Sequence, residues 1–216
     1  MTWIKICGTT NLEDAQTAVE AGADALGFVF YEKSPRKVDA KTASEIVATL
    51  PGKVEKVGVF VDDSPDRVHE VAEQIGLTAV QIYYPQQLQG LVRYPLLKKI
   101  YVSSGYNLSR GTFSISEDFG KSIYALLIDS GSLANPGGTG QRFDWASAKG
   151  KIGELRSVAP IVVAGGLTPL NVGEAMRLLL PWGVDVSSGV EATPGKKDPA
   201  RVRAFVAAVR SAEQVQ

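Results

Sequence analysis

Short hydrophobic runs, many of them β-branched, alternate along the chain with longer segments in which hydrophobic residues recur every three or four positions. Runs of the first kind are typical of β-strands, and segments of the second kind are typical of amphipathic helices. Several runs are hydrophobic on both faces, which favours parallel strands covered on each side. The pattern predicts strands at residues 3–7, 25–30, 56–61, 79–83, 97–102, 124–129, 161–164 and 184–187.

Capping signals predict where several helices begin. Thr10 and Glu13 match a capping box, in which each side chain satisfies a backbone N–H that would otherwise have no partner. Three further starts place a capping side chain before a proline at the first helical position: Ser64 before Pro65, Thr168 before Pro169 and Asp198 before Pro199. Residues 106–120 have no clear apolar period, so we expect only a short or irregular helix there.

Alternating strands and helices fit two architectures, an open doubly wound sheet and a closed barrel. The 216 residues divide into eight units of about 216/8 = 27 residues, near the lower end of the range of ~200 to 400 residues for such barrels. A Gly-x-Gly-x-x-Gly turn does not follow the first predicted strand. The sequence therefore predicts an α/β fold in which residues 1–216 form a single (β/α)8 TIM-barrel domain.

Composition and charge narrow the class of protein. Hydrophobic residues make up 44% of the chain and charged residues 21%, a balance that favours a globular protein with a sizeable core. Lys and Arg together number 23, as do Asp and Glu. The chain therefore has no excess of positive charge that would favour nucleic acid or an anionic membrane as a partner. Any anion must be bound locally, and we expect the partner to be a small molecule.

The numbers of cysteine and histidine residues bear on disulfides and metal sites. Cys7 is the single cysteine and His69 the single histidine, so we expect neither an internal disulfide nor a transition-metal site. The residues after Met1 alternate like a strand rather than forming a signal peptide. We expect a cytoplasmic protein that is a monomer or a homodimer.

The carboxyl ends of barrel strands form the active-site face of such folds, so reactive residues there are candidates for chemistry. Cys7 ends the first predicted strand. It is either a small inert core residue or, if a cation such as Lys5 or a helix N-terminus lowers its pKa, a usable base. Asp129 ends the sixth predicted strand behind three large apolar residues. It either caps a loop or pairs with a base, or it is a general acid whose pKa is raised by burial.

Other residues at this face are candidates for binding. Arg36, in the turn after the second strand, can bind a carboxylate through two parallel hydrogen bonds, or it can simply be solvated. Small residues that follow the seventh and eighth strands, the usual phosphate site of these barrels, predict a phosphate site with N–H groups and a following helix N-terminus: Gly165, Gly166, Ser187, Ser188 and Gly189. The Gly-rich residues 137–140 are either a flexible loop or a backbone that closes over substrate.

These residues fall within motifs that extend along the whole chain. The motifs are Lys-Ile-Cys-Gly at 5–8, Gly-Phe-Val-Phe at 27–30, Ser-Pro-Arg at 34–36, Val-Gly-Val-Phe at 57–60, Gly-Gly-Thr-Gly at 137–140 with Phe-Asp-Trp at 143–145, Ala-Gly-Gly-Leu at 164–167 and Val-Asp-Val-Ser-Ser-Gly-Val-Glu at 184–191. In their order, and with the Cys7 and Asp129 pair, they resemble the phosphoribosylanthranilate isomerase family.

The resemblance implies a cofactor-independent isomerase of tryptophan biosynthesis. It implies an Amadori rearrangement of N-(5-phosphoribosyl)anthranilate to 1-(2-carboxyphenylamino)-1-deoxyribulose 5-phosphate. Asp129 would protonate the ribose ring oxygen and open the ring to a Schiff base, and the Cys7 thiolate would remove the C2 proton to give an enolamine. Arg36 would hold the anthranilate carboxylate, and the turns at 165–166 and 187–189 would hold the phosphate.

One position departs from the family pattern, and alternatives remain. Where the family has Gln-Leu-His-Gly at the end of the fourth strand, this chain has Gln81-Ile82-Tyr83-Tyr84, which places two bulky phenols on that side of the site. One alternative is the related sugar-phosphate isomerase of histidine biosynthesis, which uses an aspartate pair, although Cys7 argues against it. Another is a non-catalytic protein that binds a phosphorylated metabolite.

Overall fold

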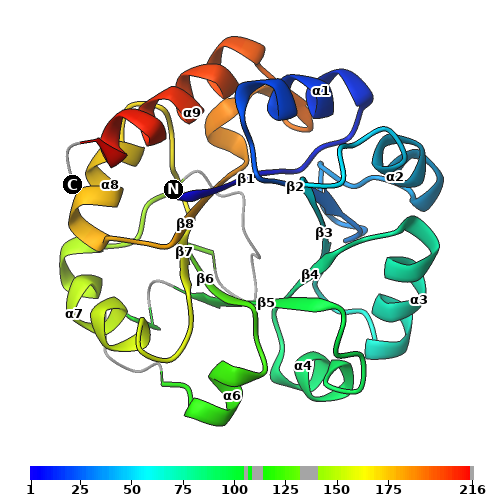
Figure 1. Ribbon diagram of the computed structural model, residues 1–216, viewed down its shortest axis with the longest axis horizontal. Helices are drawn as coiled ribbons and strands as arrows, with labels where there is room; N and C mark the ends of the chain where they lie inside the picture. Colours follow the sequence, from blue (N-terminus) through cyan, green and yellow to red (C-terminus); the bar gives the residue numbers. More distant parts are fainter. Residues whose placement is uncertain (105–106, 109–113, 132–140, 215–216) are drawn as a thin grey trace.

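A closed barrel of eight parallel strands forms the centre of the molecule (Figure 1). The computed structural model describes residues 1–104, 107–108, 114–131 and 141–214. The strands are β1 (Trp3–Cys7), β2 (Ala25–Val29), β3 (Glu55–Phe60), β4 (Ala79–Ile82), β5 (Lys98–Ser104), β6 (Ala125–Asp129), β7 (Ile161–Val163) and β8 (Gly183–Val186). The predicted barrel is confirmed, and where strand ends differ from the prediction they differ by one or two residues.

The helices surround the barrel as an outer ring (Figure 1). They are α1 (Leu12–Ala21), α2 (Ala40–Val47), α3 (Pro65–Ile75), α4 (Pro85–Leu91), α6 (Glu117–Lys121), α7 (Trp145–Leu155), α8 (Val172–Leu179) and α9 (Pro199–Glu213). Between β8 and α9 lie a short 3-10 turn, η1 (Ser188–Val190), and a hairpin formed by β9 (Glu191–Thr193) and β10 (Lys196–Lys197). Across the described ranges, no helix combines the length and hydrophobicity needed to cross a membrane.

The helix starts predicted from capping signals are confirmed in two cases. Ser64 caps α3 by accepting from the backbone N–H of Arg67, and Asp198 caps α9 by accepting from the N–H groups of Ala200 and Arg201. In the weak fifth unit, α6 is short, as predicted. Residues 105–106 and 109–113 of that unit lie outside the described residues.

Two predicted starts are wrong. Asn11, rather than Thr10, caps α1, because the Thr10 hydroxyl donates to the carbonyl oxygen of Gly195 at 2.5 Å. The helix predicted to begin at Thr168 and Pro169 begins instead at Val172. The Thr168 N–H donates to the Asn171 side chain at 2.8 Å, so these residues form a turn before the helix.

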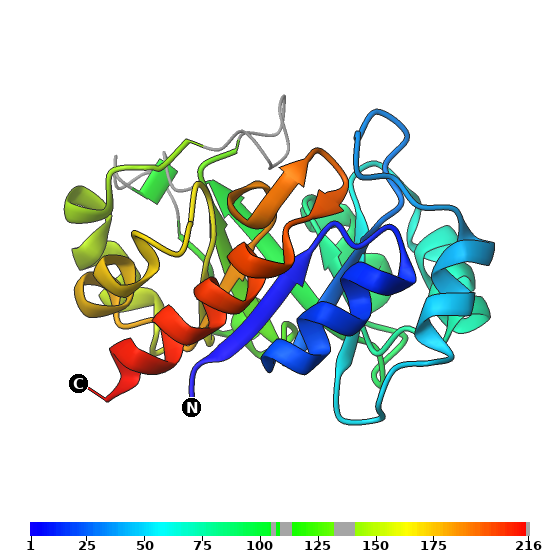
Figure 2. The same ribbon diagram turned by 90° about the horizontal axis from the view of Figure 1, so that it is seen from above.

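Barrel closure brings the two ends of the chain together. β1 pairs with β2 on one side and with β8 on the other, which places Lys5 opposite both Ala25 and Asp185. α1 and α9 also lie side by side outside this seam (Figures 1 and 2). The first and last strands are therefore neighbours within one active-site face.

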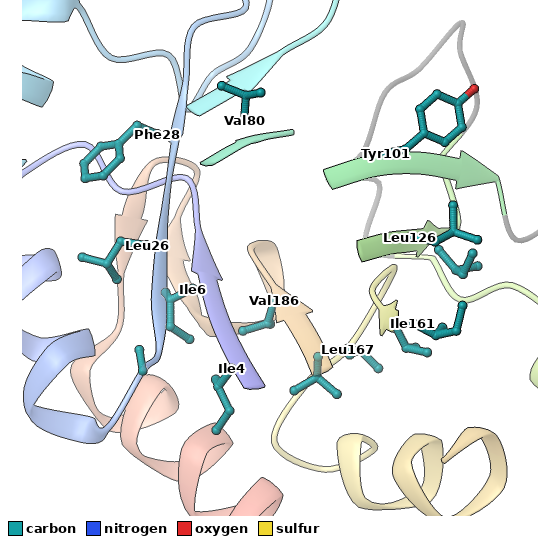
Figure 3. Close-up of a cluster of buried hydrophobic side chains, with 14 of the residues drawn as sticks. Ile4, Ile6, Leu26, Phe28, Val80, Tyr101, Leu126, Ile161, Leu167 and Val186 are labelled. Carbon is teal, nitrogen blue, oxygen red and sulfur yellow. The ribbon is translucent and has the colours of Figure 1, made fainter. Parts of the chain in front are cut away.

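The core consists of two hydrophobic layers, one between strands and helices and one inside the barrel. Ile4, Ile6, Leu26 and Phe28 belong to the outer layer, on the side of the strands that faces the helices (Figure 3). The inner layer is a second cluster that includes Trp3, Cys7, Val57, Val59, Ala79, Tyr83, Ile100, Leu127 and Val162. Because side chains alternate along a strand, Cys7 and Tyr83 face the barrel interior rather than the helices.

The two ends of the barrel differ. In Figure 2 the N-terminus and the end of α9 lie at one end of the barrel, and the β9–β10 hairpin lies at the other. The strands end on the hairpin side, so the hairpin lies at the face where active sites of this fold occur.

Candidate active site

Cys7 and Asp129 both lie at the carboxyl ends of their strands, β1 and β6, and both are buried. Asp185 and Tyr83 each interact electrostatically with both of them. The thiol and the carboxyl group therefore belong to one site, inside the mouth of the barrel.

Asp129 has the environment of a general acid. Burial raises the pKa of its carboxyl group, and the negative charge of Asp185 acts in the same direction. The Oδ1 atom accepts hydrogen bonds from the Gly131 N–H at 3.0 Å and the Ser130 hydroxyl at 3.2 Å, which oppose the shift without cancelling it. The expected effect of burial on Asp129 is confirmed.

Cys7 differs from the expectation for an activated thiolate. Burial raises the pKa of the thiol, and although the nearby Lys5 ammonium acts to lower it, Asp185 offsets part of that effect. A cation is present, as the sequence suggested, but desolvation outweighs it because the site is enclosed. The resting thiol is therefore protonated.

A charged pair lies inside the barrel beneath these two residues. The wholly buried Lys5 ammonium donates to Asp185 Oδ1 and to Gln81 Oε1, each at 3.0 Å. Although burial opposes it, the charges of Asp185 and Cys7 raise the pKa of Lys5. Asp185 and Gln81 were not among the predicted site residues. The signal in the sequence is a charged residue in the middle of an apolar strand, in both β1 and β8.

Arg36 reaches the same end of β1. Gly8, at φ 78°, leaves room for it, since a Cβ atom at Gly8 would lie 2.7 Å from Arg36 Cδ and 3.1 Å from Ser187 Oγ. The guanidinium is not simply solvated, because Nε and Nη2 donate to the two carboxylate oxygens of Glu191 at 2.9 and 2.8 Å. Arg36 is thus fixed beside Cys7 by a carboxylate that the sequence analysis did not single out.

Glu191 and Lys197 complete this network from the β9–β10 hairpin. The buried Lys197 ammonium donates to Glu191 Oε1 at 2.9 Å and to the Cys7 carbonyl oxygen at 2.5 Å. Burial opposes it, but the hydrogen bonds from Arg36 and Lys197 lower the pKa of Glu191. The hairpin therefore ties the end of β1 to Arg36 through an ionised carboxylate.

The five residues predicted to bind phosphate line one pocket. Its walls are Asp129, Ala164, Gly165, Gly166, Leu167, Asp185, Val186, Ser187, Ser188 and Gly189, and it holds about 300 Å³ of space including its mouth. The structure thus brings the turns after β7 and β8 together, next to Asp129.

Backbone geometry explains the small residues of this pocket. Gly165 and Gly166 have φ values of 77° and 65°, which favour glycine. A Cβ atom at Gly189 would lie 1.8 Å from the Leu167 carbonyl oxygen, so the two turns are in direct contact. Among the described residues, the buried Ser187 hydroxyl has no hydrogen-bond partner. Of the two expected helix N-termini, that of α8 lies further along the chain, at Val172, whereas the short 3-10 helix η1 begins at Ser188, in the wall of the pocket.

Two further expectations concern the Gly-rich loop and a metal site. The Gly-rich loop at 137–140 lies outside the described residues. In the part of the chain that the structure describes, no group of three or more His, Cys, Asp or Glu side chains could hold a metal ion.

Most of the chain is similar to proteins of one known family. Residues 4–208 match the family model of N-(5'-phosphoribosyl)anthranilate isomerase. The N-(5'-phosphoribosyl)anthranilate isomerase of Geobacter sp. (strain M21) is 48% identical over 209 residues, which cover 96% of this chain and 97% of that protein.

Solved structures show the same fold. The crystal structure of phosphoribosyl anthranilate isomerase from Thermotoga maritima superposes with a TM-score of 0.84 at 35% identity, covering 98% of this chain and 100% of that one. A phosphoribosyl anthranilate isomerase in complex with reduced 1-(o-carboxyphenylamino)-1-deoxyribulose 5-phosphate superposes with a TM-score of 0.79, with the same identity and coverage.

A closed barrel with a buried thiol and a buried carboxyl group at its mouth has the architecture of a (β/α)8-barrel enzyme. The match over residues 4–208 and the identity to the Geobacter relative make the family specific. The chain belongs to the N-(5'-phosphoribosyl)anthranilate isomerase family.

Proposed function

We propose that the chain isomerises N-(5'-phosphoribosyl)anthranilate to 1-(o-carboxyphenylamino)-1-deoxyribulose 5-phosphate, a step of tryptophan biosynthesis. Family membership supports the reaction, as does the related structure that holds the reduced product. The observation that carries the proposal is the pocket that Asp129 shares with the glycine turns. Asp185 also lines this pocket and interacts electrostatically with Cys7, which ends β1 at the same face of the barrel. The substrate requires an acid–base pair next to a phosphate site, and these residues supply both.

Asp129 is the general acid of the proposed mechanism. Its raised pKa favours the protonated form, which gives a proton to the ribose ring oxygen as the bond from that oxygen to C1 breaks. The nitrogen lone pair forms the C=N bond of the Schiff base. The open-chain sugar then has an acidic hydrogen at C2.

Cys7 is the general base. The reactive form is the singly protonated pair whose proton lies on Asp129 and not on Cys7. In that form the Cys7 thiolate removes the proton at C2, the electron pair of the C–H bond forms a C=C bond, and the Schiff-base nitrogen becomes neutral. The resulting enolamine tautomerises to the ketone. Proton transfers account for every step, so the proposed mechanism calls for no cofactor.

The two ends of the substrate have separate binding sites in this proposal. The turns with Gly165–Gly166 and Ser187–Gly189 hold the phosphate through their backbone N–H groups. Arg36 holds the anthranilate carboxylate, since Glu191 occupies only two of its five N–H donors. The sugar lies between them, next to Cys7 and Asp129.

The test is a turnover assay on phosphoribosylanthranilate, which is formed beforehand by condensation of anthranilate with ribose 5-phosphate with loss of water, and its consumption is followed by fluorescence. Turnover by the purified chain is the expected result. Binding without turnover would support the non-catalytic alternative, and turnover of the histidine-pathway aminoaldose alone would support the related isomerase.

We also propose that residues 1–216 act as one barrel domain, as a monomer or a homodimer. Analytical ultracentrifugation distinguishes the monomer from the homodimer.

A further inference from the structure

Gln81 has an amide group whose orientation is fixed by its neighbour. The Lys5 ammonium donates to Gln81 Oε1 at 3.0 Å, and an ammonium group has only hydrogens to offer. The amide oxygen must therefore face Lys5, because the reverse orientation would place two donors against each other. The Nε2 group then faces the opposite way, toward the mouth of the barrel.

Tyr83 receives the hydrogen bond from this amide. Gln81 Nε2 donates to the Tyr83 hydroxyl oxygen at 3.2 Å. Because that oxygen is the acceptor, the single hydrogen of the phenol points to a third group. The described residues offer no acceptor for that hydrogen, although the hydroxyl is enclosed.

The phenol remains a donor at working pH. Burial raises the pKa of Tyr83, and its acidic neighbours Asp129 and Cys7 act in the same direction, so the hydroxyl keeps its proton. A buried donor without an acceptor is costly, so binding of a ligand that offers an acceptor oxygen to this hydroxyl is favoured.

The position of Tyr83 identifies that partner. Its side chain belongs to the inner cluster with Cys7, and its hydroxyl interacts electrostatically with Cys7 and Asp129. If the proposed function holds, the substrate atoms beside those two residues are C2 and the ring oxygen, so the nearest acceptors are sugar oxygens. We propose that Tyr83 donates a hydrogen bond to a hydroxyl oxygen of the substrate's sugar, and that Lys5 and Gln81 are positioning residues that direct this donor.

The first test removes only the hydroxyl. Tyr83→Phe should lower kcat/KM about fivefold, the usual effect of losing one neutral hydrogen bond. It should weaken binding of the reduced product analogue, measured by calorimetry, by a similar factor. Tyr101→Phe is the matched control, because it removes another buried phenol hydroxyl that lies on the outer face of the barrel against Phe119. Both values should stay unchanged in the control.

The second test addresses orientation. Gln81→Glu keeps the acceptor for Lys5 but replaces the Nε2 donor with an oxygen, which draws the phenol hydrogen toward itself. Tyr83→Phe should then cost less than about twofold in the Gln81→Glu background, instead of about fivefold. The added charge is present on both sides of that comparison, so it cancels. Circular dichroism and urea unfolding check that each variant is folded.

The outcomes separate this inference from the proposed function. Turnover by the wild type with an unchanged kcat/KM in Tyr83→Phe would overturn the role of Tyr83 alone. An equal loss from Tyr83→Phe in both backgrounds would overturn the orientation by Gln81. A wild type that binds the analogue without turnover, together with weaker binding by Tyr83→Phe, would overturn only the proposed function. Failure of the wild type to bind the analogue would overturn both.

Discussion

Arg36 and Glu191, 155 residues apart, are joined by two parallel hydrogen bonds of 2.9 and 2.8 Å from Nε and Nη2. These bonds use the Nε hydrogen and one hydrogen of Nη2, on one edge of the planar guanidinium. Three hydrogens at its far end are not used by Glu191: both of those on Nη1 and the second on Nη2. The carboxylate therefore fixes the plane of Arg36 while it leaves a second fork for a ligand. This relationship makes Arg36 a preorganised carboxylate site rather than a solvated loop residue.

Arg36→Met should lower kcat/KM by about 10- to 100-fold, the range for losing a hydrogen-bonded charge. A substrate analogue that lacks the anthranilate carboxylate should show little difference between wild type and variant. Steady-state kinetics on both substrates checks this. An equal penalty on the analogue would show that Arg36 acts on something other than the carboxylate.

Cys7→Ala and Asp129→Asn should each leave the protein folded and lower kcat at least ~10²-fold, the low end for the loss of a general acid or base. Both side chains are small and lie at the strand ends, so the core is retained. Single-turnover fluorescence and circular dichroism measure the two effects. A folded variant with a wild-type rate would exclude that residue from proton transfer.

The pH profile of kcat/KM should be bell-shaped. Burial raises the pKa of Asp129 above its ordinary 3.8 and that of Cys7 above its ordinary 9.0. Below the Asp129 pKa both groups hold protons and no thiolate can form, whereas above the Cys7 pKa neither group can give a proton. Activity therefore requires the singly protonated pair. The apparent pKa values of the two limbs of the profile are properties of the coupled pair and not of either residue alone.

The same profile has a control. In Asp129→Asn the residual activity should rise through the raised pKa of Cys7 instead of that of Asp129 and should lack the alkaline limb, because formation of the thiolate is then the one titration of the pair that remains. An acid limb that persists unchanged would assign it to another residue.

Inorganic phosphate should inhibit competitively, and Gly166→Ala should raise its inhibition constant. The φ of 65° makes a Cβ atom unfavourable there by roughly 1–2 kcal/mol, and the side chain would disturb the turn that lines the pocket. Gly76→Ala, at φ 79° in the C-cap of α3, is the matched control for backbone strain. Urea unfolding should show similar destabilisation in both, and only Gly166→Ala should alter inhibition. Undiminished inhibition in Gly166→Ala would exclude this turn as the phosphate site.

Lys5→Met should destabilise the fold by about 3–5 kcal/mol, because it leaves the Asp185 carboxylate buried without its cation. Asp185→Asn introduced into the Lys5→Met variant should recover part of the loss, because the uncompensated charge is removed. The free energy of unfolding in urea at pH 7 measures both. A loss below about 1 kcal/mol would place the pair in the range of exposed ion pairs.

The sequence determined the elements and pointed to much of the candidate site. Hydrophobic period predicted each strand of the barrel, because alternation along a strand or helix depends on residues that are close in the chain. The rule that barrel strands end at the active-site face then led to Cys7, Asp129 and the glycine turns without knowledge of any contact. Local competition accounts for the two incorrect helix starts: Asn11 rather than Thr10 accepts the capping hydrogen bond of α1, and the Asn171 side chain accepts from the Thr168 N–H in a turn that precedes α8.

Tertiary structure decided what these residues touch. Lys5 and Asp185 lie 180 residues apart and meet only because the barrel closes β1 onto β8. Arg36 meets Glu191 because the β9–β10 hairpin lies over the end of β1, and burial, which no local pattern reports, raised the pKa of Cys7 despite a nearby cation. Closure and desolvation depend on the whole barrel at once, so the electrostatics of the site could be read only from the folded chain.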